Sequence, residues 1–182
     1  LVALLARMGV TDVRLTGGEP LVRREFPVLA AMLGRIEGLR DLALTTNGTT
    51  LARHAGPLHA AGLTRVNVSL DSLVTHRFAE MTRRDALDRV LGGIAAAQAA
   101  GLAPVKVNCV VVGGTNDDEI LDFVDFARRT GCEVRFIENM PLGAGGRWVP
   151  DGVVPAAEVL AVIAAHHELS PRARGAEPAN AF

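Results

Sequence analysis

The chain has 182 residues, of which 49% are hydrophobic and 21% charged, and its formal net charge is -1. This composition is typical of a globular protein with one sizeable core, and the charge excludes the clustered basic face of a nucleic-acid-binding domain. No apolar window is long enough for a membrane span, and we expect no signal peptide. Residue 1 is Leu rather than Met, so we expect a piece of a longer protein.

Short apolar runs alternate with longer amphipathic ones along the chain, as strand–helix units do. The predicted strands are 12–16, 41–46, 65–70, 105–112 and 133–138. The predicted helices are 1–8, 25–36, 51–61, 86–100, 117–129 and 156–166. Glycines that can take a left-handed conformation stand near the ends of four helices, at Gly38, Gly62, Gly101 and Gly131. Near-continuous apolar strands joined by helices predict a parallel sheet covered by helices.

The first strand runs into Thr16-Gly17-Gly18-Glu19-Pro20. Two adjacent glycines let a ligand approach the backbone where a Cβ would intrude. Glu19 supplies a fixed hydrogen-bond acceptor, and Pro20 ends the strand. A strand that ends in glycines, an acid and a proline predicts a binding site at its carboxyl end.

Polar residues recur at the carboxyl ends of the other predicted strands. They are Thr45–Gly48, Asn67 with Ser69, Asp71 and Ser72, Lys106 with Asn108, and Arg135 with Glu138–Met140. Polar side chains on the inner face of apolar strands are costly unless partnered, so their recurrence predicts a polar cavity. Arg14, Lys106 and Arg135 would supply cations for an anionic ligand. Loops that face one cavity favour a barrel or partial barrel over an open doubly wound sheet.

Each of these residues also has a purely structural interpretation. Thr46-Asn47-Gly48 alone is a turn, and Ser69–Ser72 is equally compatible with a helix N-cap. Lys106 could extend along the sheet to solvent, and Met140 could simply fill a loop. The five histidines show no metal-ligand spacing. Cys109 and Cys132 form no Cys-x-x-Cys pair, so we expect two reduced, buried thiols in a cytoplasmic protein and no metal ligands.

Several segments together resemble radical S-adenosylmethionine (SAM) enzymes and, more narrowly, the GTP 3′,8-cyclases of molybdenum cofactor biosynthesis. The segments are Thr16–Pro20, Thr45–Gly48, Val68–Ser72, Thr82–Asp85, Pro104–Asn108, Asn116–Glu119 and Arg135–Pro141. The resemblance implies a partial (β/α)₆ TIM-like barrel of parallel strands with outer helices, its first strand missing from this chain. It implies a radical SAM core at 1–143, followed by the start of a C-terminal extension at 144–182.

The resemblance also implies which residues contact which ligand. Contacts with SAM would come from Gly17, Gly18, Glu19, Ser69 and Met140. Contacts with GTP would come from Arg14, Thr45 and Lys106. The implied reaction begins with one-electron cleavage of SAM by a reduced iron–sulfur cluster. The adenosyl radical then takes hydrogen from C3′ of GTP, and ring closure on C8 gives (8S)-3′,8-cyclo-7,8-dihydroguanosine 5′-triphosphate. The cofactors carry this chemistry, and the protein positions and shields them.

The chain departs from this family in its cysteines. The Cys-x₃-Cys-x₂-Cys loop for one [4Fe-4S] cluster and the cysteine trio for a second are both absent, and Cys109 and Cys132 match neither. We therefore expect this chain alone to be inactive, with no catalytic or metal-binding residue of its own. Implied partners of the intact protein are a flavodoxin or ferredoxin as electron donor, cyclic pyranopterin monophosphate synthase as the next enzyme, and a second copy in a homodimer. The alternatives are another radical SAM enzyme, such as a peptide-modifying one, or a cluster-free module that binds nucleotide or SAM.

Overall fold

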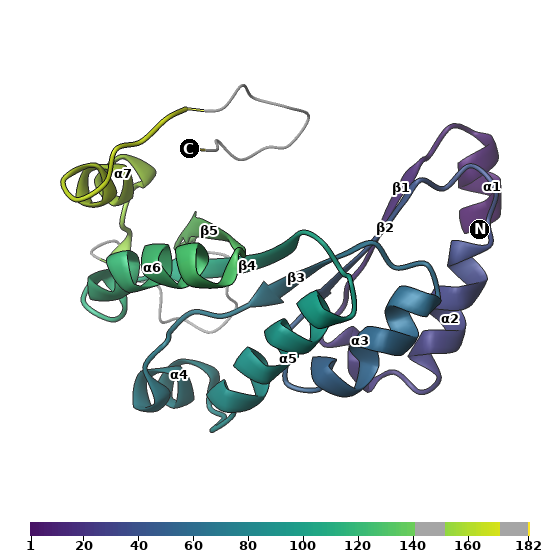
Figure 1. Cartoon of the computed structure of the whole chain (residues 1–182), viewed down its shortest axis with the longest axis horizontal. Coiled ribbons are helices and arrows are strands. Elements are labelled where there is room, and N and C mark those ends of the chain that lie inside the picture. The colour runs from purple at the N-terminus through teal and green to yellow at the C-terminus, as the bar shows by residue number, and fades with distance from the viewer. Residues whose placement is uncertain (141–151, 172–181) are drawn as a thin grey trace.

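The protein is built on a sheet of five parallel strands that follow one another in chain order (Figure 1). The computed structural model describes residues 1–140, 152–171 and 182. The strands are β1 (Asp12–Leu15), β2 (Asp41–Thr46), β3 (Arg65–Ser69), β4 (Val105–Val111) and β5 (Glu133–Glu138). Every strand pairs with its neighbour in sequence, which is the order of a barrel and not the reversed order of a doubly wound sheet. The predicted partial TIM-like barrel is confirmed.

Helices connect the strands. They are α1 (Val2–Arg7), α2 (Phe26–Gly34), α3 (Leu51–Ala60), α4 (Thr75–Thr82), α5 (Leu87–Ala99), α6 (Ile120–Thr130) and α7 (Ala156–Ala164), with two 3₁₀ turns, η1 (Pro20–Val22) and η2 (Asp117–Glu119). The four predicted glycines all have positive φ, between +72° and +93°. Among the described residues, no helix combines the length and the apolar character needed to cross a bilayer.

One helix was not predicted. α4 lies between β3 and α5, and Phe78 is its one buried residue. Without an apolar stripe, this segment carries no helical periodicity in the sequence. The other departures are small: β1, β3 and β4 each end one residue early, and the helix predicted at 117–129 is η2 followed by α6. The predicted loop at 141–146, Trp148 and tail residues 172–181 lie outside the described residues, and the division at 143 stays a prediction.

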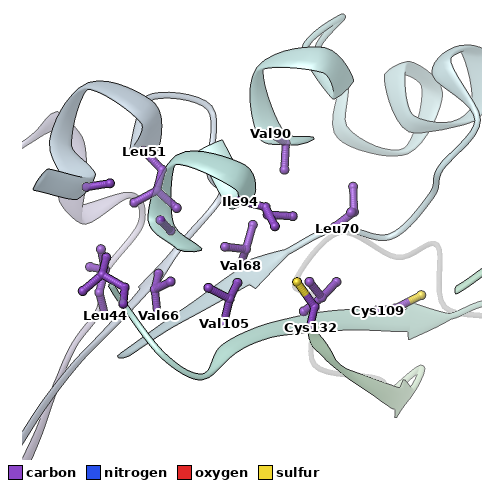
Figure 2. Close-up of a cluster of buried hydrophobic side chains, with 14 of the residues drawn as sticks. Leu44, Leu51, Val66, Val68, Leu70, Val90, Ile94, Val105, Cys109 and Cys132 are labelled. Carbon is purple, nitrogen blue, oxygen red and sulfur yellow. The ribbon is translucent and has the colours of Figure 1, made fainter. Parts of the chain in front are cut away.

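The core lies between the sheet and the helices. Figure 2 shows Leu44, Val66, Val68 and Val105 of the strands directed toward Leu51 of α3 and toward Val90 and Ile94 of α5. All of these side chains are buried. Because side chains alternate along a strand, the residues between them in sequence lie on the opposite face. That opposite face carries the polar residues of the predicted site.

Candidate functional site

The polar face is arranged in tiers, which the register of the strands defines. Thr45, Asn67, Lys106 and Glu133 are successive partners across β2 to β5. Ser69, Asn108 and Arg135 form the next tier on this face. Two residues of a parallel strand rise about 6.6 Å, so the second tier lies about that much nearer the carboxyl ends. We call these the lower tier and the upper tier.

Lys106 is buried in the lower tier, and only 3% of it is exposed. Its ammonium Nζ lies 3.1 Å from Oε2 of Glu133, and Nη2 of Arg135 lies 3.9 Å from the same oxygen. Burying an ammonium group is tolerated when a carboxylate partners it. The alternative interpretation, in which Lys106 extends to solvent, is wrong.

Lys106 is also the only lysine in the sequence, because arginine supplies the other 18 of its 19 Lys and Arg residues. Lysine ends in a compact ammonium that redirects its donors freely, whereas the planar arginine head needs more room. In a chain that otherwise uses arginine, this choice favours a role that depends on a compact charge.

Asn67 stands beside Lys106 in the lower tier and is 2% exposed. Its side-chain oxygen Oδ1 is buried and has no hydrogen-bond partner within the described part of the chain. Thr45, its neighbour on β2, is half-buried. The lower tier therefore offers a hydroxyl, an amide and an ammonium in a row.

Gly17 and Gly18 lie at the carboxyl end of β1 and are exposed. A Cβ built on either would meet no protein atom within 4 Å, so packing within the described chain does not explain these glycines. Gly17 also has φ of +157°, which side chains rarely allow. The two residues leave a stretch of bare backbone exposed, and their contact with SAM stays a prediction.

Glu19 joins the loop after β1 to the loop after β2. Its Oε1 accepts hydrogen bonds from the Leu21 amide at 3.0 Å and from Thr46 Oγ1 at 2.7 Å. Its Oε2 accepts one from the Asn47 amide at 2.7 Å. Thr46 Oγ1 in turn accepts from the Gly48 amide. Both carboxylate oxygens are thus engaged in fixing loops, while direct contact between Glu19 and SAM stays a prediction.

Glu119 does the same between the loops after β3 and β4. Its side chain, in a residue 1% exposed, accepts hydrogen bonds from Ser72 Oγ at 2.7 Å, from the Leu73 amide at 2.6 Å and from Arg77. Ser72 therefore does not act as an N-cap, because its hydroxyl is tied to Glu119 and to the backbone of Val74. The sequence analysis missed this role of Glu119.

Asn116 adds to the connection. Its Nδ2 donates to the carbonyls of Asp71 and Val110, and its Oδ1 accepts from the Val112 amide. Asp71 accepts from the Val110 amide through Oδ1, and burial raises the pKa of this carboxyl group. Four of the segments that resemble the cyclases are thus hydrogen-bonded in two pairs. Thr16–Pro20 is bonded to Thr45–Gly48, and Val68–Ser72 is bonded to Asn116–Glu119.

The remaining predicted contacts lie around these tiers. Ser69 is exposed in the upper tier, and Met140 follows β5 by two residues with 54% of its surface exposed. Arg14 is exposed on the edge strand and pairs with Ala43, one tier below Thr45. The SAM candidates thus lie at or beyond the carboxyl ends, and the GTP candidates lie deeper. Their roles as ligand contacts stay predictions.

The cysteines do not fit an iron–sulfur cluster. Cys109 and Cys132 are both buried (Figure 2), and burial raises the pKa of both thiols. A cluster needs several thiolates at close spacing. Across residues 1–140, 152–171 and 182, no three His, Cys, Asp or Glu side chains are grouped to hold a metal ion.

The family model described as "Radical SAM superfamily" matches residues 1–127. The chain belongs to the radical SAM superfamily. Membership implies SAM and an iron–sulfur cluster as the cofactors of the family. The superfamily predicted from the sequence is confirmed.

Curated relatives narrow the likeness to proteins named GTP 3′,8-cyclase. One from Ectopseudomonas mendocina is 56% identical over 75% of this chain and 41% of its own length. One from Acidothermus cellulolyticus is 49% identical over 93% of this chain and 47% of its own length. One from Paenarthrobacter nicotinovorans is 47% identical over 98% of this chain and 51% of its own length. The chain thus spans about half the length of the curated relatives it matches.

Solved structures support the fold. "Structure of TYW1 with a lysine-pyruvate adduct bound" has a TM-score of 0.66 at 16% identity and covers 85% of this chain and 49% of its own. A radical SAM methyltransferase from Sphaerobacter thermophilus has a TM-score of 0.64 at 19% identity, with 89% and 50% covered. At such identities the likeness concerns the fold alone.

Proposed function

We propose that this chain is the SAM- and GTP-binding part of a GTP 3′,8-cyclase, a radical SAM lyase of molybdenum cofactor biosynthesis. The relatives named GTP 3′,8-cyclase align with 75% to 98% of the chain. The observation that carries the proposal is the buried lower tier, where the sole lysine stands beside Asn67, whose Oδ1 has no hydrogen-bond partner among the described residues. A deep row of polar side chains that includes an ammonium group fits a polar anionic substrate better than an apolar one.

In this proposal the upper end of the site holds SAM. The bare backbone at Gly17 and Gly18 lies against the methionine moiety, and Ser69 and Met140 complete the contacts. Glu19 fixes the loop that carries the glycines, so their amides and carbonyls keep one geometry. When bound, SAM supplies the adenosyl group that abstracts hydrogen from the substrate.

The lower tier holds GTP. Nζ of Lys106 in the lower tier and Nη2 of Arg135 in the upper tier lie 3.1 Å and 3.9 Å from Oε2 of Glu133, so two cations stand close to where phosphate or the polar edge of guanine would bind. Thr45 adds a hydroxyl, and Arg14 adds an exposed guanidinium at the edge strand. The described residues do not fit an iron–sulfur cluster, so no chemical step is assigned to this chain.

Partners and location follow from the same likeness. We propose a flavodoxin or ferredoxin as reductant, cyclic pyranopterin monophosphate synthase as the next enzyme, a homodimer and a cytoplasmic location. Two [4Fe-4S] clusters belong to the proposed full-length cyclase.

Isothermal titration calorimetry of the 182-residue chain with GTP tests the assignment. We expect Lys106→Met to weaken GTP at least tenfold and to leave SAM affinity unchanged, because Ser69 and the glycines lie in another tier. Arg89→Met, which removes an exposed cation from α5, is the matched control and should change neither affinity. A chain that binds SAM but not GTP would refute the cyclase assignment and favour another radical SAM enzyme.

A further inference from the structure

The side-chain amide of Asn67 includes a buried polar atom that the fold of the described chain leaves without a partner. Asn67 is 2% exposed, and its Oδ1 is buried without a hydrogen-bond partner among the described residues. Nearly all buried polar groups in proteins are hydrogen-bonded, and each exception calls for a reason. A group held for a ligand is one such reason.

Folding does not require an amide at this position. Val66 and Val68, on either side of Asn67, fill the core against α5 (Figure 2), and Asn67 lies on the other face of β3. β3 is the central strand of the sheet. An apolar residue in such a place would avoid burying a polar group without a partner. The amide is therefore better explained by binding than by stability.

The neighbours of Asn67 define what it can recognise. It pairs in register with Thr45 on one side and with Lys106 on the other. The Lys106 ammonium only donates hydrogen bonds, whereas the Asn67 oxygen only accepts them. The missing partner of Asn67 is therefore a donor. A triphosphate at neutral pH offers acceptors, so the donor belongs to the nucleoside.

We propose that Asn67 reads the nucleoside portion of the substrate by accepting a hydrogen bond from a ribose hydroxyl or a guanine N–H. This proposal rests on the proposed function, since it takes GTP as the ligand. Lys106 binds an acceptor of the same ligand next to it. Together the two side chains distinguish a nucleoside triphosphate from triphosphate alone.

Substrate analogues test the proposal on the unsubstituted chain. Four analogues each remove one donor: 2′-deoxy-GTP, 3′-deoxy-GTP, inosine 5′-triphosphate (the 2-amino group) and 1-methyl-GTP (the N1–H). Calorimetry should find one of them at least tenfold weaker than GTP, and its identity assigns the donor to ribose or base. Equal affinity for GTP and all four analogues would overturn the proposal.

Variants then connect the lost donor to Asn67. Asn67→Leu, which keeps the approximate size and removes the acceptor, should bind GTP at least tenfold more weakly and should no longer distinguish it from that analogue. Asn67→Asp keeps an acceptor and should still distinguish the two. Unchanged SAM affinity in both variants serves as the folding control. An Asn67→Leu chain that retains the full discrimination would overturn the proposal.

Failure of the proposed function looks different. If the unsubstituted chain does not bind GTP, or if Lys106→Met binds it normally, the GTP assignment itself is wrong. If GTP binds, Lys106→Met loses it, and Asn67→Leu still discriminates, only the role of Asn67 is wrong.

Discussion

Replacing Glu119 by Ala should be among the most destabilising single changes outside the apolar core. The carboxylate is buried and accepts hydrogen bonds from Ser72, the Leu73 amide and Arg77. Its removal leaves the Leu73 N–H without an acceptor and leaves the Ser72 hydroxyl only the Val74 carbonyl, at 3.2 Å, and breaking a buried ionic hydrogen-bond network costs about 3–5 kcal/mol. Because Arg77 keeps Asp118 as a partner, we take the low end, about 3 kcal/mol.

Urea unfolding followed by far-UV circular dichroism measures this loss, and thermal unfolding gives a second estimate. For a chain of this length, about 3 kcal/mol corresponds to a fall in Tm of about 6–12 °C. Asp118→Ala is the matched control, because Asp118 pairs with the same arginine but its side chain is 68% exposed. An exposed pair contributes about 0–1 kcal/mol. Equal losses in the two variants would show that the buried carboxylate does not hold these loops.

Three further predictions concern the same sheet. Burial raises the pKa of Asp71 in the folded state, so above about pH 4 the folded protein binds more protons than the unfolded protein, and its free energy of unfolding falls as pH rises. Asp71→Asn should flatten this fall in Tm measurements over a pH series, and an unchanged slope would refute the prediction. Gly48→Ala should destabilise by about 1–3 kcal/mol in urea unfolding, since its Cβ would lie 2.9 Å from Val68 at φ of +76°, whereas Gly56→Ala in open space on α3 should stabilise by about 0.5–1 kcal/mol. Cys109 and Cys132 are buried with raised thiol pKa, so a disulfide reagent at pH 8 should label neither thiol in the folded chain and both in urea, and rapid native labelling would contradict the burial.

The strands and most helices were predictable because the signal is local. The apolar run Leu42–Leu44, for example, is buried on both faces of a parallel sheet, and amphipathic helices follow such strands. α4 was not predicted because its one buried side chain, Phe78, leaves no periodic pattern in the sequence.

The site was predictable in outline only. Alternation along a strand places Lys106 on the face opposite the helices, but its burial depends on Glu133, which reaches it through the register of β5. The alternation of buried residues limits which face each side chain takes, but the partner of Lys106 on β5 follows only from how the two strands pair in the folded sheet.

Glu119 could have been found. A helical spacing of i, i+3, i+4 and i+7 connects four buried residues, which are Asn116, Glu119, Ile120 and Phe123. Residues at this spacing fall on one helical face. A polar residue in the apolar stripe of a helix predicts a buried hydrogen-bonded group. Of the two acids that pair with Arg77, Asp118 is exposed and Glu119 is buried.

The two glutamates hold the loops around this site through hydrogen bonds. Loops at the carboxyl ends of parallel strands carry the ligand contacts, and they contribute few side chains to the core. Glu19 connects the loop after β1 to the loop after β2, and Glu119 connects the loop after β3 to the loop after β4, so a carboxylate fixes two of the pairs of adjacent strands. Gly18 and Ser69, which are not among the hydrogen-bond partners of these carboxylates, remain exposed. Within the run from Thr16 to Pro20, Gly17 and Gly18 therefore leave open space beside the backbone, and Glu19 fixes the loop around that space through hydrogen bonds.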